Sequence, residues 1–414
     1  MIVAATTNFK FTPTPIFHVG ESNAVMPSIE SLNAPLAFKA RLDGAPPDDL
    51  ATDEESAIVV KSRSLEGMQK EALVHNGRTG AAWRMTCDEG PYLNGTDLAP
   101  FPLAFFTAGM AISITSNICA IAKGEGEDVG GLEITLDNYY TMEGSAVRGD
   151  MTGGALPAEL SVKAPGIGAG RLQEIADAAV RLSPAAAFLR DVLISEFSLH
   201  HNGALVAAGA VKSTVAEILP PPTGDFDRIS RDKGAAPSAP ILNKLESAEK
   251  LFDVEGGVGT SLHAEQKRLL HVRAVVHVNE EGFYDARIQL FKPIGSVFRF
   301  IGDDPPHRGG RGLAPSGLDY LSAGVAFCYM TQLGRYAQIV KQDLESYELV
   351  QLTRFGAPAP SLDDGEASAR PVVTHVYVNS AEELEKVQKL ILMGEQTCFL
   401  HAALRSSNPV NIHV

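Results

Sequence analysis

The chain has 414 residues, of which 45% are hydrophobic, and it carries a formal net charge of −15 at pH 7. This length is sufficient for two or three hydrophobic cores, so two domains are expected. Lysine and arginine form no clusters, which argues against a nucleic-acid backbone or an anionic membrane surface as a partner, because both attract clustered cations. Small molecules and other proteins remain as partners.

The cysteines and the N-terminal segment predict a reducing compartment. Residues 1–15 lack a basic start followed by a continuous apolar run, so no export signal is expected. Four cysteines are too few for a disulfide scaffold, and none lies in the CxxC spacing of a zinc or dithiol motif. We therefore expect a cytoplasmic protein that needs no metal and no cofactor.

The first long element is a stretch without charged residues, 98–122, which by length alone could span a membrane. It begins with two prolines and contains several hydroxyl and amide side chains. A similar stretch at 313–337 includes Asp319, Gln332 and Arg335. A helix that is buried on all sides in a globular fold is therefore the favoured interpretation.

The second half of the chain begins after residues 219–240, which are rich in proline, glycine and charge and are predicted to form a linker or a long surface loop. Two β-rich runs within 268–290 are joined by Asn-Glu-Glu-Gly, which is a hairpin signal. The elements predicted after this hairpin are a strand at 296–302, a buried helix near 316–340, strands near 346–354 and 371–378, and a helix over 380–404. Ser380 is the expected N-cap of that last helix, with Glu383 three residues further on.

An internal repeat relates the two halves of the sequence. At an offset of 215 residues, and without a gap, LAPFPLAFFTAGMA (98–111) aligns with LAPSGLDYLSAGVA (313–326). The same offset aligns LSPAAAFLR (182–190) with TCFLHAALR (397–405). The preserved spacing predicts a duplicated α+β domain.

The predicted domains are an N-terminal repeat over 1–218, a linker over 219–244 and a C-terminal repeat over 245–414. Within them, the offset aligns Cys328 with Ser113 and Cys398 with Ser183. One reading is a working thiol pair whose counterparts were lost from the first copy. The other reading is that buried cysteine acts only as a small hydrophobic residue that exchanges readily with serine.

Two segments of the second copy resemble the cysteine-bearing helices of the OsmC/Ohr family, the osmotically inducible protein C and organic hydroperoxide resistance proteins. They are GLDYLSAGVAFCYM (317–330) and EELEKVQKLILMGEQTCFLHAAL (382–404). The resemblance covers most of both repeats and implies two tandem OsmC-like domains with antiparallel strands wrapped around long central apolar helices. Because family members are typically intertwined homodimers, it also implies an internal pseudo-dimer with one complete thiol site.

In this family, the first cysteine attacks the O–O bond of an organic hydroperoxide and the second forms a disulfide with the resulting sulfenic acid. The resemblance gives these roles to Cys328 and Cys398, and it implies a lipoyl-type dithiol as the reductant that restores them. It also implies an arginine beside the first thiol, for which Arg299 is the matching position. Such a cation would offset the rise in thiol pKa that burial causes.

One position departs from the family pattern. A glutamate that orients the arginine lies ten residues before the first cysteine in the family, and this position is Leu318 here. The adjacent Asp319 is a candidate substitute, although one residue turns a helical side chain by about 100°. His401, three residues after Cys398, is a candidate base for a thiol. Arg84, which aligns with Arg299, either contributes across the internal boundary or pairs with acids on the surface, and the surface interpretation is favoured.

Three functions follow from these features. The leading prediction is a thiol-dependent peroxidase that reduces organic hydroperoxides. The alternative is a cysteine-dependent hydrolase or lyase that acts on a small acyl or thio compound, with His401 or Asp319 as the acid or base. The third is a binding or scaffold protein with an apolar pocket between the repeats. Further assembly into a homo-oligomer stays open.

Overall fold

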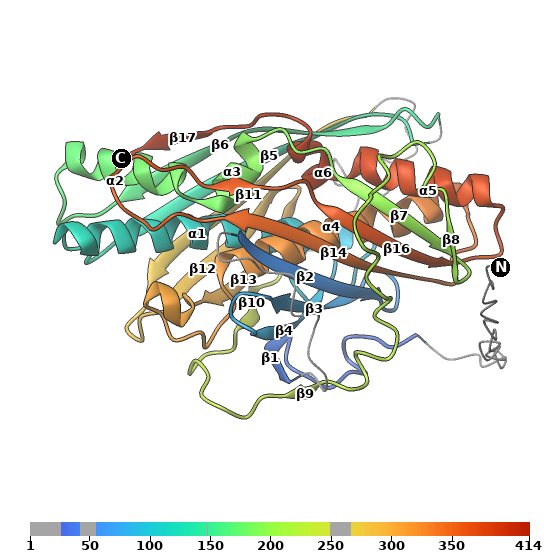
Figure 1. Cartoon of the computed structure of the whole chain (residues 1–414), viewed down its shortest axis with the longest axis horizontal. Helices are drawn as coiled ribbons and strands as arrows, with labels where there is room; N and C mark the ends of the chain where they lie inside the picture. The colour runs from blue at the N-terminus through green and yellow to red at the C-terminus, as the bar shows by residue number, and fades with distance from the viewer. Residues whose placement is uncertain (1–25, 42–54, 147, 249–265) are drawn as a thin grey trace, which may run out of the picture.

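The computed structural model describes residues 26–41, 55–146, 148–248 and 266–414, which form a mixed α+β fold (Figure 1). The helices are α1 (Pro102–Glu125), α2 (Ala169–Arg181), α3 (Pro184–Arg190), α4 (Gly317–Val340), α5 (Leu384–Thr397) and α6 (Phe399–Leu404), with short 3-10 turns η2 (Pro91–Leu93) and η4 (Pro306–Arg308). The strands are β1 (Ala37–Arg41), β2 (Glu55–Ser64), β3 (Lys70–Asn76), β4 (Ala82–Cys87), β5 (Glu133–Gly144), β6 (Thr152–Lys163), β7 (Glu196–His201), β8 (Ala204–Val206), β9 (Ser230–Arg231), β10 (Leu242–Glu246), β11 (Gln266–Val278), β12 (Tyr284–Lys292), β13 (Ile294–Gly302), β14 (Ser346–Gly356), β15 (Ser368–Ala369), β16 (Val373–Asn379) and β17 (Val410–His413).

The strands form two sheets that each combine the N-terminal and C-terminal halves of the chain. One sheet has the order β8-β7-β16-β14-β2-β3-β4-β1-β9, with β15 paired to β14. The other has the order β10-β13-β12-β11-β5-β6-β17. The halves meet where β14 pairs with β2 and where β11 pairs with β5, both antiparallel. The hairpin predicted from Asn-Glu-Glu-Gly is β11–β12, and the strand predicted at 296–302 lies within β13.

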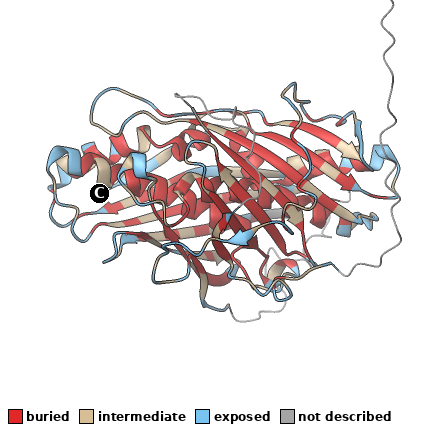
Figure 2. Ribbon diagram, turned by 60° about the horizontal axis from the view of Figure 1, so that its bottom comes forward, coloured by how far each residue is buried: buried red, intermediate tan, exposed pale blue. Residues whose placement is uncertain are grey.

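The helices α1 and α4 lie between the two sheets and pack against each other. α4 contacts β2, β3 and β14, whereas α1 contacts β5, β11 and β12. Nearly all side chains of both helices are buried, and Figure 2 shows this buried region continuing into the central strands. Within the described residues, α1 is the one helix long and apolar enough to cross a membrane, and 83% of its apolar window is buried inside the fold.

Glycines allow α1 and α4 to approach backbone to backbone. A Cβ atom at Gly317 would lie 2.5 Å from the carbonyl oxygen of Gly109 and 2.7 Å from the amide nitrogen of Ser113. A Cβ atom at Gly324 would lie 2.6 Å from the amide nitrogen of Phe106. These distances leave no room for a side chain, so glycine is required at both positions of α4. The close packing brings the start of α4 next to Ser113.

The 215-residue offset of the sequence recurs in the positions of the elements. It relates both ends of α1 to both ends of α4, since 317 − 102 and 340 − 125 are both 215. It also relates the starts of α2 and α5, the starts of α3 and α6, and the two turns η2 and η4. The region predicted as a linker, 219–244, contains β9 and the start of β10, which pair with β1 and β13.

The single helix predicted over 380–404 is wrong. Ser380 is not its N-cap: its hydroxyl donates to the carbonyl oxygen of Asp343 and accepts the amide of Glu382. Helix α5 instead begins after Glu383, which makes no side-chain capping bond. At Cys398 the backbone becomes extended, with φ −70° and ψ 117°, and α6 begins at the next residue. The chain therefore changes direction at the second cysteine of the predicted pair.

Candidate functional site

Cys328 and Cys398 are brought together although they lie 70 residues apart in the sequence. Cys328 is in the middle of α4, and Cys398 lies at the break between α5 and α6. Both side chains are buried free thiols, and they hydrogen-bond to each other. Cys398 makes this contact at the point where the chain leaves α5.

His401 completes this group on the side of Cys398. Its Nδ1 lies 3.2 Å from the Cys398 Sγ, and the histidine is fully buried. The imidazole packs beside the rings of Phe197 and Tyr329, with centroid distances of 5.5 and 5.1 Å. Nδ1 donates to the sulfur when it carries the proton, and it accepts from the Cys398 thiol when it does not. His401 is thus held by packing in position to exchange a hydrogen bond with Cys398.

The two thiols differ in their electrostatics. Burial raises the pKa of Cys328 well above its ordinary value, and its hydrogen bond to Cys398 adds to this rise. Burial also acts to raise the pKa of Cys398, but the bond that it accepts from Cys328 and the interactions with His401 lower it well below the ordinary value. The negative charge of this coupled pair is therefore best stabilised on Cys398.

Two other residues predicted for the site lie elsewhere. The Arg299 guanidinium is bonded to both carboxylate oxygens of Asp285. It is on the opposite face of β13 from Phe298 and Phe300, which are buried in the core, because successive strand residues alternate between faces. The expectation that Arg299 stands beside the first thiol is therefore wrong.

Asp319 lies at the first turn of α4, where it forms a capping box with Ser316. Its other carboxylate oxygen accepts a 3.0 Å hydrogen bond from Asn76, and burial raises its pKa. Nine residues separate Asp319 from Cys328, which corresponds to about 13 Å along a helix. Asp319 therefore begins the helix and does not contact the thiols or Arg299.

Arg84 was interpreted from the sequence as a surface residue, and the structure corrects this. Its side chain is 3% exposed, and its Nε and Nη2 both donate to one carboxylate oxygen of Glu71, which is 2% exposed. The other oxygen of Glu71 pairs with Arg63. The pair lies on the outer face of the β3–β4 ribbon, where Phe38 of β1 covers it. Arg84 is thus a buried structural arginine, equivalent in position to Arg299.

A pocket of about 290 Å³, which is lined by neither cysteine of the thiol pair, was missed by sequence reasoning. Its wall includes Phe399, which follows Cys398, and Arg335, which is seven residues after Cys328 on α4. Arg268, Leu270 and Phe291 line it as well. The available signal was Arg335 itself, a charged residue in a mainly apolar helix and two turns from a cysteine.

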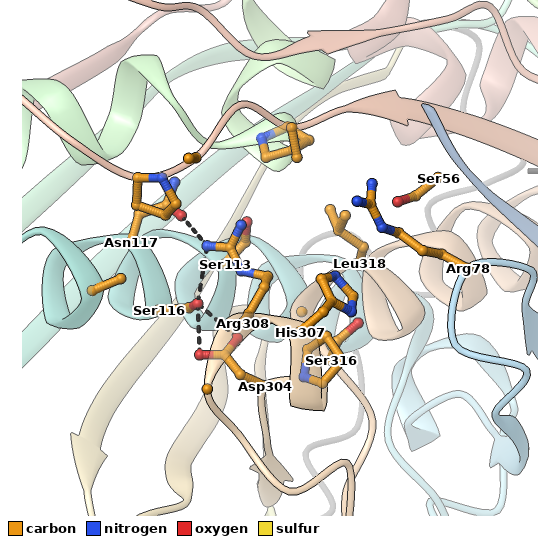
Figure 3. Close-up of a pocket in the computed structure, with 18 of the residues that line it drawn as sticks. Ser56, Arg78, Ser113, Ser116, Asn117, Asp304, His307, Arg308, Ser316 and Leu318 are labelled. Carbon is orange, nitrogen blue, oxygen red and sulfur yellow. Dashed lines mark hydrogen bonds between the residues drawn. The ribbon is translucent and has the colours of Figure 1, made fainter. Parts of the chain in front are cut away.

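The position equivalent to the thiol pair holds two hydroxyl groups. The Oγ atoms of Ser113 and Ser183 lie 2.9 Å apart, so the contact between the aligned residues is retained in the other half. Ser113 lines a second pocket, of about 470 Å³ (Figure 3). Its lining includes Ala120 and Pro184, which the offset aligns with Arg335 and Phe399 of the first pocket. The two pockets therefore occupy equivalent places in the fold.

Neither pocket contains a metal-binding cluster. Among the described residues, no group of three or more histidine, cysteine, aspartate or glutamate side chains could hold a metal ion.

Comparison with known proteins identifies the region that carries both cysteines. Residues 309–413 match the model of a family described as OsmC-like protein. No match is found among curated proteins. Two solved structures match parts of this chain with low TM-scores of 0.22 and 0.25. The first is an OsmC-like hydroperoxide resistance protein from Jannaschia sp. CCS1, with 20% identity over 33% of this chain and 85% of that chain. The second is an organic hydroperoxide resistance protein OsmC from Legionella pneumophila, with 17% identity over 34% of this chain and 93% of that chain.

Proposed function

We propose that the protein is a thiol-dependent peroxidase that reduces organic hydroperoxides through Cys328 and Cys398, since residues 309–413 match the model of the OsmC-like family. The observation that supports this function is the hydrogen bond between the two buried thiols. A sulfenic acid is short-lived unless a second thiol can reach it, and here the second thiol is already in contact.

The proposed reaction has three steps. One thiolate attacks an oxygen of the hydroperoxide, the O–O bond breaks, and the alkoxide leaves as an alcohol after taking up a proton. The attacking sulfur becomes a sulfenic acid. The other thiol then attacks that sulfur, which forms the Cys328–Cys398 disulfide and releases water. An external dithiol, such as a lipoyl group, reduces the disulfide and is itself oxidised.

The order of the two cysteines is open to test. The family resemblance gives the attack to Cys328. The contact of His401 with Cys398 supports the reverse order, because an adjacent imidazole favours the thiolate form and the thiolate is the nucleophile. We propose that Cys398 attacks and Cys328 resolves.

The architecture proposed for this function is a fused internal pseudo-dimer of two OsmC-like domains. The halves would be an N-terminal repeat over 1–218 and a C-terminal repeat over 245–414, joined by 219–244. The equal offset of the helices and the exchange of strands between the sheets support this proposal. One half then provides the thiol pair and the other provides serines at the equivalent place. A reducing cytoplasm is the compartment in which such a free thiol pair would persist.

A second candidate function is a cysteine-dependent hydrolase. The contact between His401 and Cys398 favours it, because a thiol beside an imidazole is the arrangement used for nucleophilic attack on acyl groups. In this reaction Cys398 would be the nucleophile and Cys328 would be dispensable.

Activity measurements with single variants separate these functions. For the peroxidase, we expect consumption of cumene hydroperoxide with dihydrolipoamide as reductant, and a loss of at least about 1,000-fold in both Cys328→Ser and Cys398→Ser, as for removal of a catalytic nucleophile. Cys119→Ser is the matched control and keeps full activity. Turnover of a thioester that survives in Cys328→Ser, without peroxide consumption by the parent protein, would establish the hydrolase instead.

A further inference from the structure

The pocket around Ser113 is the larger of the two equivalent pockets, about 470 Å³ against about 290 Å³. Its volume lies in the range that small-molecule sites occupy. Ser113 and Ser183 occupy the positions that Cys328 and Cys398 occupy in the other half. Because a hydroxyl group cannot replace a thiol in peroxide reduction, this pocket cannot carry out the reaction of a cysteine pair. A pocket without a thiol nucleophile suits a site that binds and does not react.

We propose that this pocket is a second binding site, for a small organic molecule that carries a carboxylate or a phosphate group. The proposal is independent of the peroxidase function, because it uses none of the residues around Cys328 and Cys398. It is argued from the charged groups, the hydrogen-bond donors and the apolar walls of the pocket.

The charges of the pocket favour an anion. Arg78, Arg308 and His307 line it, and Asp304 is its carboxylate. Both oxygens of Asp304 are already engaged, by the hydroxyl of Ser116 at 2.7 and 2.9 Å and by a tyrosine hydroxyl at 2.6 Å. Figure 3 shows His307 between the two arginines. Among the described lining residues, two guanidinium groups against one carboxylate give a net positive charge, and guanidinium groups bind carboxylates and phosphates well.

The two arginines differ in how firmly they are held. Arg308 donates to the Oδ1 of Asn117 at 2.6 Å, and Asn117 in turn donates to the carbonyl oxygen of Ala179. This chain of bonds fixes the Arg308 guanidinium inside the pocket. The Arg78 guanidinium makes no hydrogen bond or ion pair with any other described residue, and it is exposed at the mouth. One cation is therefore preorganised and the other is available to close on a ligand.

Ser113 supplies a neutral donor at the bottom of the pocket. Its side chain is 9% exposed and its only described side-chain partner is Ser183. Ser183 is fully buried and already accepts the amide of Ala186. When Ser183 donates to Ser113, the Ser113 proton is free to bond to a ligand oxygen.

The remaining walls suit an organic body rather than a free inorganic ion. They are formed by Ala120, Pro184, Leu318, Pro358 and Pro360. Such apolar surface gains nothing from contact with a hydrated ion, whereas it can cover a short alkyl chain.

Calorimetric titration of the full chain tests the proposal with hexanoate, hexyl phosphate and the neutral hexan-1-ol. We expect saturable 1:1 binding of at least one anion and none of the alcohol. Binding of one anion alone identifies the preferred group. Arg78→Gln and Arg308→Gln should each weaken binding by about 10-fold or more, which is the usual effect of losing a hydrogen bond to a charged group.

Two controls make the result specific. Arg41→Gln removes an exposed arginine that pairs with Asp232 outside the pocket, and it should bind the anion like the parent protein. The double variant Cys328→Ser/Cys398→Ser should also bind normally. The proposal is overturned if neither anion binds, if hexan-1-ol binds equally, or if both Arg78→Gln and Arg308→Gln bind like the parent. Arg78→Gln removes no described side-chain bond, so its effect cannot be attributed to misfolding.

Discussion

At the scale of residues, the sequence correctly predicted that His401 lies beside a thiol. It wrongly placed Arg299 in the same site. His401 could be placed because a spacing of three residues from Cys398 keeps two side chains close along one helical stretch. Arg299 was assigned to the site only through the family resemblance. The alternation of β13, in which Phe298 and Phe300 face the core, decides instead that the arginine faces outward.

We predict that His401→Phe removes the donor to Cys398 while it keeps the aromatic packing. Because His401 helps to lower the pKa of Cys398, the pH at which the pair forms a thiolate should rise in the variant. Peroxide reduction at neutral pH should fall by about 100-fold. The ultraviolet absorbance of the thiolate, recorded as a function of pH, measures the shift. An unchanged titration midpoint would mean that the imidazole does not act on the sulfur.

The two equivalent arginine pairs provide a matched stability prediction. Glu71→Gln leaves the buried Arg84 uncompensated and also removes the carboxylate partner of Arg63, so it should lower the free energy of unfolding by about 3–5 kcal/mol. Asp285→Asn removes the partner of Arg299, whose pair is 26% exposed on both sides, and should cost no more than about 1 kcal/mol. Urea denaturation measures both values. Equal losses in the two variants would contradict the burial argument.

At the scale of elements, the sequence predicted the two long apolar helices well and the last helix poorly. Absence of charge and a preserved offset were sufficient to locate α1 and α4. The break at Cys398 has no local signal, since neither glycine nor proline occurs there. It follows from tertiary contacts, in which Cys398 meets Cys328 and the chain turns, and such contacts override local propensity.

The close contact of α1 and α4 predicts opposite effects of two glycine variants. Gly324→Ala places a Cβ atom 2.6 Å from the backbone of Phe106 and should destabilise the fold by about 1–3 kcal/mol through overpacking. Gly124→Ala, near the end of α1, meets no atom within 4 Å and should stabilise the helix by up to about 1 kcal/mol. Urea denaturation compares them. A Gly324→Ala variant as stable as Gly124→Ala would show that the helices are not in contact there.

At the scale of the whole molecule, the repeat could be predicted but the exchange of strands could not be derived from the residues alone. The 215-residue offset shows that two segments of the sequence are similar, but it does not determine which strands pair with each other. The pairing of β2 with β14 and of β5 with β11 is long-range information, and only the family resemblance implied an intertwined arrangement. The serine pocket was missed for the same reason, because its lining comes from both halves.

The shared sheets predict that the two halves unfold together. Since each sheet contains strands from both halves, neither half can lose its strands without disrupting both sheets. Differential scanning calorimetry should therefore give one transition, with a calorimetric enthalpy equal to the van't Hoff enthalpy. Two separated transitions would indicate that the halves are independent domains.

The most direct test of the peroxidase account is the intact mass of the protein before and after one equivalent of cumene hydroperoxide. The account predicts the loss of two hydrogen atoms, with peptide mapping showing one disulfide between Cys328 and Cys398. An unchanged mass, a stable gain of oxygen on one cysteine, or a disulfide that involves Cys87 or Cys119 would contradict it.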